Sequence, residues 1–115
     1  MIKKENRLKK NKHFNFIYKH GSGVGSKYIT LVFIKAKVKP FKVGFSVNNK
    51  IGKSVVRNKV KRKMRAVFNE IYPLIDRRYN YIFVAREGID SLDYNGIKTE
   101  MLYVIKKAGL INEHN

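Results

Sequence analysis

Apolar residues recur along the chain at two spacings, one typical of amphipathic helices and one typical of strands. The first helix is predicted to begin with Asn11 as its N-cap and to end at Gly21. Between them, Phe14, Ile17 and Tyr18 are spaced i, i+3 and i+4, so their side chains share one face. This spacing predicts an amphipathic helix near the start of the chain.

Strand signals follow this helix and return once in the second half of the chain. Residues 28–34 and 79–85 are rich in β-branched and aromatic side chains, which is typical of buried strands. Residues 42–47 alternate between apolar and polar positions, so their larger apolar side chains fall on one face of a strand. The glycine-rich residues 21–25 leave two interpretations open, a loop or a weak short strand.

Two longer helices complete the predicted pattern. The first is expected to begin at Ser54, its N-cap, and to run to about Tyr72, where Pro73 stops it. Its apolar stripe consists of Val56, Val60, Met64, Val67, Phe68 and Ile71. Asp93 is expected to cap the last helix, which ends at Gly109. The order helix, two or three strands, helix, strand, helix predicts an α/β (α+β) two-layer sandwich with a mainly antiparallel sheet.

The chain is long enough for one hydrophobic core. It has 115 residues, of which 43% are hydrophobic and 12% aromatic, so residues 1–115 are predicted to form a single domain. Residues 1–6 and 111–115 are expected to be loose termini. The absence of cysteine excludes disulfides and zinc–cysteine sites and favours a cytoplasmic location. No apolar run reaches the roughly 20 residues that a membrane span requires.

Positive charge is concentrated in the first half of the chain. The 26 lysines and arginines outnumber the 8 acidic residues, which gives a net charge of +18. Residues 6–69 contain 18 of these cations and no acidic residue, so the rest of the chain is neutral. A block of one sign in a sequence that otherwise looks folded indicates a polyanionic partner. Nucleic acid is the first candidate, and an anionic membrane surface is the second.

The long helix and the loop before it carry the densest part of this block. Their cations are Lys50, Lys53, Arg57, Lys59, Lys61, Arg62, Lys63 and Arg65. Like charges four residues apart destabilise a helix by roughly 0.2–0.5 kcal/mol per pair, and no glutamate before Glu70 relieves this repulsion. A phosphate-binding surface is therefore predicted here, with a solvated face as the alternative. Asn58 on the same side could read a base edge or a ribose, or stay solvated.

Two aromatic residues of the first helix indicate contact with single-stranded RNA. Phe14 and Tyr18 share one helical stripe beside the basic Lys12 and Lys19. Aromatic rings in a cationic groove stack on bases, and each stacked base contributes about 1–3 kcal/mol. A partly exposed stacking platform is the prediction, and the alternative is that both rings belong to the ordinary core.

Motifs for catalysis by the chain itself are missing. Gly52-Lys53-Ser54 opens a helix, but Val47 stands where a phosphate-binding loop needs glycine, which excludes an NTPase. The three histidines lack metal-ligand spacing, and no nucleophile–base pair or pair of catalytic carboxylates is evident. No catalytic residue, protein-held metal or small-molecule substrate is therefore expected. If a reaction takes place, a partner is expected to supply the catalytic groups.

Several short motifs occur together along almost the whole chain. They are Asn6-Arg7-Leu8-Lys9-Lys10, then Phe14 and Tyr18 before Lys19-His20-Gly21, then Val43-Gly44-Phe45-Ser46-Val47 with Lys50-Ile51-Gly52, and finally Arg57-Asn58-Lys59-Val60-Lys61-Arg62-Lys63-Met64-Arg65. From about residue 6 to residue 110 the chain closely resembles the protein subunit of bacterial ribonuclease P. Lys59 stands where that family usually has arginine, and Asn49 stands where it usually has lysine.

The resemblance implies a role in a ribonucleoprotein endoribonuclease. Ribonuclease P removes the 5′ leader from precursor tRNA by hydrolysing one phosphodiester bond. Its catalyst is a large RNA that uses bound Mg²⁺, held mainly by that RNA and by substrate phosphates. The protein is expected to bind this catalytic RNA and the single-stranded 5′ leader, and to help position the substrate and magnesium.

The resemblance also implies roles for individual residues and one unusual connection. The expected RNA-binding residues are Arg57, Asn58, Lys59, Lys61, Arg62, Arg65, Lys50 and Lys53. The expected 5′-leader cleft consists of Phe14, Tyr18, Lys61 and Arg65. The family fold implies a left-handed β-α-β crossover, although nearly all such crossovers are right-handed.

Two other classes of function stay open at this point. One is a ribosomal or assembly protein with no link to cleavage, which composition alone does not separate from a ribonuclease P subunit. The other is a peripheral membrane protein, which the lack of an obvious amphipathic helix suited to a membrane surface disfavours. The expected partners are RNA, with no membrane among them.

Overall fold

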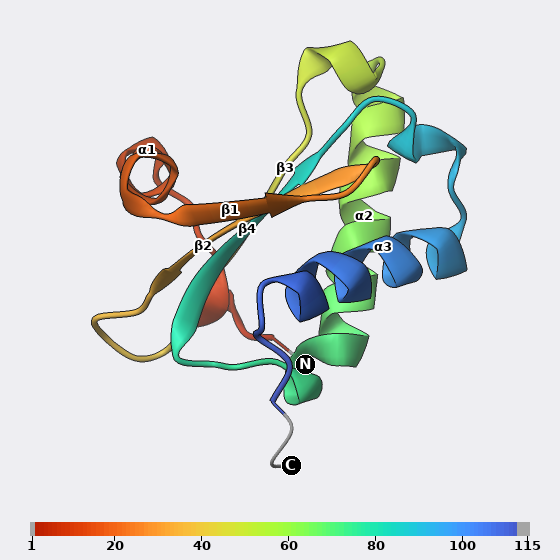
Figure 1. The fold of residues 1–115 in the computed structure, drawn as a ribbon. Coiled ribbons are helices and arrows are strands. Elements are labelled where there is room, and N and C mark those ends of the chain that lie inside the picture. The colour runs from red at the N-terminus through yellow and green to blue at the C-terminus, as the bar shows by residue number, and fades with distance from the viewer. Residues whose placement is uncertain (1, 113–115) are drawn as a thin grey trace.

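The computed structural model describes residues 2–112 and contains a four-stranded sheet between helices (Figure 1). In chain order the elements are α1 Asn11–His20, β1 Ser22–Gly25, β2 Ile29–Lys35, β3 Val43–Ser46, α2 Ser54–Ile71, β4 Tyr79–Ala85 and α3 Tyr94–Lys107. Helix α1 lies on one side of the sheet, and α2 and α3 cross each other on the other side (Figure 1). The expected two-layer α+β sandwich is confirmed, with α1 as an addition on the second face of the sheet.

The order of strands across the sheet is β1-β2-β4-β3. The β1–β2 and β2–β4 pairs are antiparallel, whereas β3 and β4 are parallel, with Phe45 opposite Phe83. Two neighbouring parallel strands need a long crossover connection, and α2 provides it here. The left hand of this crossover stays a prediction from the resemblance. The arrangement leaves β3 at one edge of the sheet, next to α2.

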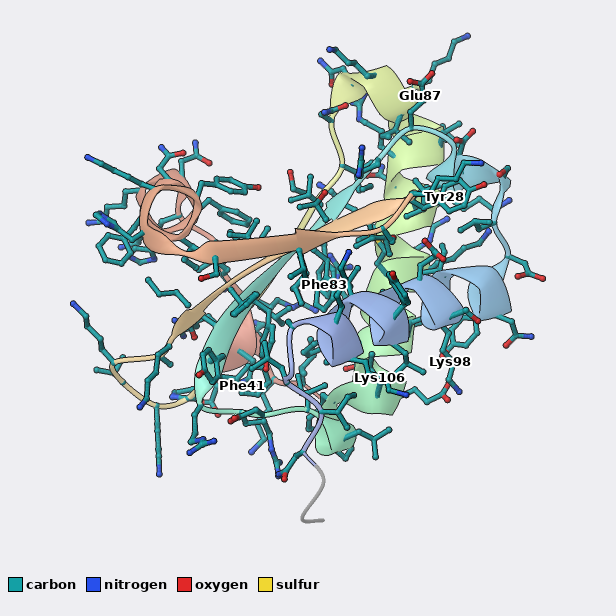
Figure 2. The ribbon with its side chains drawn as sticks, viewed as in Figure 1. Tyr28, Phe41, Phe83, Glu87, Lys98 and Lys106 are labelled. Carbon is teal, nitrogen blue, oxygen red and sulfur yellow. The ribbon has the colours of Figure 1, made fainter. Side chains whose placement is uncertain are left out.

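Most of the hydrophobic core lies between the sheet and the α2–α3 pair. Phe68 of α2 is fully buried at its centre, with its ring centroid 6.0 Å from that of Phe45 and 5.7 Å from that of Phe83. Figure 2 shows Phe83 between the sheet and α3. A smaller apolar contact forms under α1, where Ile17 is 3% exposed and Ile82 is fully buried. Burial on both sides explains why β4 reads as a continuous apolar run.

The helix ends differ in part from the predicted caps. Lys10 and Lys53 occupy the N-cap positions in place of Asn11 and Ser54, and neither lysine makes a side-chain capping hydrogen bond. Both predictions were wrong by one residue, because the extended backbone of each lysine puts the following residue inside the helix. The Asp93 cap is confirmed, since its side chain accepts a hydrogen bond from the Gly96 backbone N–H at 2.8 Å.

The N-terminal segment is not loose over residues 2–6. The Asn6 side chain is 8% exposed and donates to the Phe41 carbonyl at 2.9 Å, and its Oδ1 accepts from the Lys3 N–H. The following Arg7 forms an isolated parallel bridge with Val43 on the free edge of β3. These bonds attach the start of the chain to the sheet edge, where they satisfy the buried Asn6 side chain. At the other end, Ile111 bridges to Ile75, and residues 113–115 lie outside the described part of the chain.

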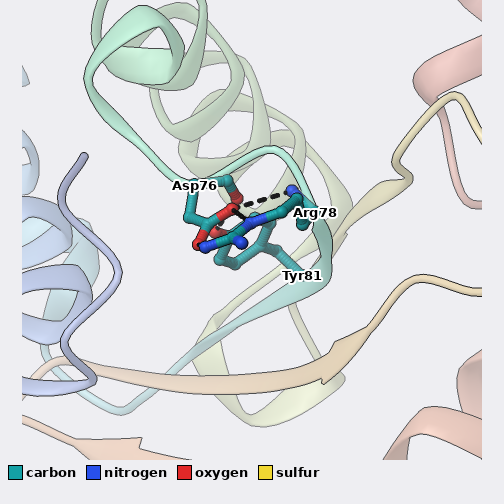
Figure 3. Close-up of polar contacts among 3 residues, drawn as sticks. All are labelled: Asp76, Arg78 and Tyr81. Carbon is teal, nitrogen blue, oxygen red and sulfur yellow. Dashed lines mark hydrogen bonds and ion pairs between the residues drawn. The ribbon is translucent and has the colours of Figure 1, made fainter. Parts of the chain in front are cut away.

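A short polar turn fixes the connection from α2 to β4 (Figure 3). Arg78 donates two hydrogen bonds to the Asp76 carboxylate, at 3.0 and 2.7 Å, and the Tyr81 hydroxyl donates to the Asp76 carbonyl. The Arg78 hydrogen bond lowers the pKa of Asp76, while burial raises the pKa of Tyr81. This turn fixes the position at which β4 begins. Strand β4 is the one that pairs with β3.

Candidate nucleic-acid interface

A cleft runs beside the edge strand β3, between α1 and α2. Two adjoining hollows form it, and they share Phe14, Phe45 and Lys61. The other lining residues are Arg7, Leu8, Lys9, Val43, Gly44 and Arg65 in one hollow, and Asn11, Asn15, Tyr18, Ser46 and Val47 in the other. All four residues predicted for the leader cleft line these hollows.

The two walls of the cleft differ in chemistry. On the α1 wall the Phe14 and Tyr18 rings lie 6.4 Å apart between centroids and are tilted by 36°. Phe14 is half-buried and Tyr18 is 43% exposed, so both rings are accessible at the surface rather than enclosed in the core. On the α2 wall the half-buried Lys61 and Arg65 lie one helical turn apart. The cleft therefore offers a stacking surface opposite two cations.

Gly44 makes room for one of these rings. A Cβ atom at this position would lie 2.6 Å from Cζ of Phe14 and 3.2 Å from Cδ2 of Leu8. Carbon atoms in contact normally lie about 3.5–4.0 Å apart, so no side chain fits without moving the ring. The glycine allows Phe14 to lie directly against β3 at the floor of the cleft.

The exposed side of α2 presents the rest of the basic motif. The side chains of Asn58, Lys59 and Arg62 are exposed and make no hydrogen bond or ion pair with residues 2–112. Arg57 is half-buried and donates from Nη1 to the Gly52 carbonyl at 2.9 Å, so one of its donors holds the loop before the helix. Arg57 therefore has a structural role in holding this loop, in addition to any contact that it makes with a ligand.

The loop before α2 contributes two further cations. Lys50 and Lys53 are both exposed, and the Asn48 side chain shapes the loop by accepting from the Lys50 backbone N–H at 3.0 Å. Lys63, which the sequence grouped with the basic helix, instead donates to the Leu92 carbonyl at 3.2 Å on the α3 side. The eight predicted RNA-binding residues therefore form a surface that extends from this loop along α2 to the cleft.

Ion pairing does not neutralise this surface. Within residues 2–112 the salt bridges are Arg78–Asp76 and Lys98–Glu70, and neither involves a cation of residues 7–65. Glu70, the first acidic residue after the basic block, accepts hydrogen bonds from Lys98 and Tyr94, which lower its pKa and keep it charged. These bonds direct the carboxylate toward α3. The basic face of α2 consequently keeps its full positive charge for a ligand.

Several cleft residues were not predicted from the sequence. Asn11 and Asn15 stand one turn apart on the cleft side of α1, and their spacing with Phe14 and Tyr18 could have shown this. Phe45 was predicted only to lie on the apolar face of its strand; it contacts Phe68, and at the open edge of β3 it also lines the cleft. Only the sheet order reveals that second role.

Across the described residues 2–112, no group of three or more histidine, cysteine, aspartate or glutamate side chains could hold a metal ion. Of the helices in that same range, none is both long and apolar enough to cross a membrane.

Comparison with known proteins identifies the family of this chain. The family model for ribonuclease P matches residues 2–109. The ribonuclease P protein component of Streptococcus agalactiae serotype Ia is 37% identical over 111 residues, covering 96% of this chain and 100% of the relative. That of Clostridium botulinum strain 657 is 36% identical over 110 residues, covering 95% and 99%.

Solved structures show the same similarity in three dimensions. The RNase P protein of Staphylococcus aureus superposes with a TM-score of 0.85 at 31% identity, covering 93% of this chain and 98% of that one. The RNase P protein of Thermotoga maritima gives a TM-score of 0.80 at 25% identity, covering 88% and 96%. Sequence and fold agree over nearly the full length, and the chain belongs to the ribonuclease P protein family.

Proposed function

We propose that the α1–α2 cleft binds the single-stranded 5′ leader of precursor tRNA, and that the exposed basic face of α2 binds the catalytic RNA. The chain is the protein component of ribonuclease P, the endoribonuclease that removes this leader during tRNA processing. It works with the RNA subunit and with precursor tRNA. The residue roles below are the proposal, and the geometry of the cleft supports them.

Leader binding uses both walls of the cleft. Unpaired bases stack on Phe14 and Tyr18, whose rings are open to the surface. The phosphates between these bases face Lys61 and Arg65 across the cleft. The Arg65 guanidinium can hold a phosphate through two parallel hydrogen bonds, whereas Lys61 acts as a point charge. Stacking does not depend on the base, so this arrangement binds leaders of varied sequence.

The catalytic RNA binds next to the leader on the same helix. Lys50 and Lys53 at the start of α2, with Arg57, Lys59 and Arg62 along it, contact phosphates, and Asn58 contacts a base edge or a ribose. Each phosphate contact releases counterions, so binding strengthens as salt is lowered. Because the basic block has no acidic partner within residues 2–112, it reduces the repulsion between the two RNA strands that meet here.

Bond cleavage itself belongs to the RNA subunit. We assign the Mg²⁺ on which the reaction depends mainly to that RNA and to substrate phosphates, as the family resemblance implies. The protein contributes by positioning the leader, which fixes the scissile bond relative to the catalytic RNA. The cytoplasm, where tRNA is matured, is the location that this proposal assigns.

One observation carries the proposal: Phe14 and Tyr18 line the same two adjoining hollows as Lys61 and Arg65. The test is Phe14→Ala in the holoenzyme reconstituted with the RNA subunit. Affinity for precursor tRNA with a leader is expected to fall roughly 5-fold to 150-fold, since one stacked base contributes about 1–3 kcal/mol. Affinity for mature tRNA without a leader is expected to stay within about twofold of the unmodified protein.

The matched control is Tyr103→Ala. Tyr103 is 52% exposed on α3, outside the cleft, and its removal is expected to leave both affinities unchanged. Circular dichroism and a thermal melt establish that each variant is folded. An equal loss of affinity for leader-bearing and leaderless tRNA with Phe14→Ala would show that Phe14 supports the fold rather than the leader.

A further inference from the structure

A second hollow lies on the other side of α1, away from the cleft. Its apolar residues are Leu8, Phe16, Ile17, Ile34 and Val38, from α1, the segment before it, and the end of β2 with its following loop. Val38 is 73% exposed and Phe16 is 45% exposed, so this apolar surface is open to solvent. None of the residues that line the cleft, apart from Leu8, takes part in it.

Cations surround the apolar floor of this hollow. Its remaining lining residues are His13, Lys35, Lys37, Lys42 and Asn80, with no acidic residue among them. Asp76 is near enough to Lys35 for the lysine charge to lower its pKa, but Arg78 already binds that carboxylate. Figure 2 shows many nitrogen-tipped side chains around α1 and along the loop from β2 to β3. A neutral apolar peptide would not match a pocket edged in this way.

Around Phe16 the second hollow has the same combination of an exposed aromatic ring and nearby lysine that the cleft has. Its ring centroid lies 4.6 Å from that of His20, and the Lys37 ammonium lies 5.8 Å from the Phe16 centroid. An exposed ring beside an apolar hollow, with a lysine within reach, can hold one unpaired base and its phosphate. Among residues 2–112 the Lys42 ammonium donates to the Glu5 backbone carbonyl and forms no salt bridge, so no carboxylate neutralises its charge there.

The second hollow and the cleft meet at Leu8, before the start of α1. This residue lines both of them. Arg7, Lys9, Lys10 and Lys12 are all exposed and flank Leu8 along the chain, and residues 7–12 contain no acidic residue. A single strand that leaves the cleft past Leu8 therefore meets positive charge until it reaches Phe16.

We propose that the part of the 5′ leader farther from the cleavage site leaves the cleft past Leu8 and places an unpaired base in this second hollow, against Phe16. The inference rests on the proposed function, because it extends the same strand beyond the cleft. Lys37 contacts the phosphate beside that base, and Lys35 and Lys42 contact its neighbours. Long leaders then gain affinity that short leaders lack.

The experiment measures binding of precursor tRNAs with leaders of about 4 and about 16 nucleotides to the reconstituted holoenzyme, the range of lengths that single-strand-binding domains cover. Phe16→Ala is expected to weaken binding of the long-leader substrate by about fivefold or more and to leave the short-leader substrate unchanged. Lys37→Ala is expected to act in the same direction and to make long-leader binding less salt-dependent. Tyr103→Ala is the matched control, because Lys107 lies 5.7 Å from its ring in the same way and Tyr103 lines neither the cleft nor the second hollow.

The outcomes separate this inference from the proposed function. If Phe14→Ala weakens binding of both leader-bearing substrates while Phe16→Ala and Lys37→Ala change neither, the cleft assignment stands and the second hollow is overturned. If Phe16→Ala instead weakens assembly of the protein with the RNA subunit, without a dependence on leader length, the second hollow does not bind the leader. If Phe14→Ala has no effect on leader binding, the proposed function itself fails. Selective crosslinking of a 4-thiouridine far out in the long leader to residues 34–42 would support the inference directly.

Discussion

Replacing Gly44 by alanine tests whether the position of the Phe14 ring controls leader binding. The added Cβ atom would lie 2.6 Å from Cζ of Phe14. Restoring ordinary carbon contact at about 3.5 Å requires the ring to move by roughly 1 Å. The ring stands at the floor of an open cleft, so it can turn outward, whereas the β3 backbone is held by its pairing with β4.

The effect on stability should be small and the effect on leader binding large. Alanine reduces the freedom of the unfolded chain, which contributes about 0.4–1 kcal/mol to stability and offsets part of the crowding. The melting temperature is therefore expected to change by only a few degrees, which a thermal melt measures. Displacing Phe14 removes stacking worth about 1–3 kcal/mol, so affinity for leader-bearing precursor tRNA should fall roughly 5-fold to 150-fold.

A double-mutant cycle tests whether Gly44→Ala weakens leader binding by displacing Phe14. If Gly44→Ala acts through Phe14, then the double variant Gly44→Ala with Phe14→Ala should bind leader-bearing tRNA no more weakly than Phe14→Ala alone. Binding is measured by titration of the holoenzyme at fixed salt. Losses that add in the double variant would refute the reasoning, because they would show that Gly44 affects leader binding without the ring.

Three further outcomes are expected. Arg62→Ala should leave the melting temperature unchanged and lower the log–log salt slope for binding the RNA subunit by roughly 0.7–0.9, the contribution of one phosphate contact; an unchanged slope would mean that Arg62 contacts no phosphate. Phe68→Ala should destabilise the fold by about 3–5 kcal/mol in chemical denaturation, because the ring is fully buried among aromatic neighbours. Hydrogen bonds from Lys98 and Arg78 lower the pKa values of Glu70 and Asp76, so their stabilisation is present at neutral pH and lost as pH falls through those lowered values. Melts between about pH 5 and about pH 3 should therefore show a smaller decrease in stability for Asp76→Asn than for the unmodified chain.

The elements with the strongest periodic patterns could be predicted from the sequence. Strand β4 matches the predicted residues 79–85, and α2 begins and ends within a residue of its predicted bounds. Burial explains this accuracy, since the Phe68 stripe and the β4 run both pack against the same core. The N-caps were less predictable, because Lys10 and Lys53 hold their extended backbone without a side-chain bond that sequence patterns could signal.

The sequence predicted part of the candidate site, namely one face of α1 and one face of α2. The helical spacing of Phe14 and Tyr18 predicted that they share one face. The lack of glutamates among the cations of α2 predicted a phosphate-binding surface there. The opposite side of α1 was not predicted, because Phe16 becomes part of a hollow only when the loop containing Lys37 and Val38 folds back beside it. Likewise, Gly44 has no signal of its own, since its role depends on a ring that is distant in sequence.

The N-terminal segment covers part of the free edge of the sheet, which would otherwise be exposed. Arg7 bridges to Val43, and the Leu8 N–H donates to the Val43 carbonyl at 2.9 Å, so this segment occupies part of the free border of β3. Removing residues 2–8 would uncover backbone donors and acceptors along a strand that also carries apolar side chains, which is the usual template for self-association. Purification tags for the assays above are therefore better placed at the C-terminus, and shortened proteins that precipitate would reveal an unprotected strand rather than a lost RNA contact.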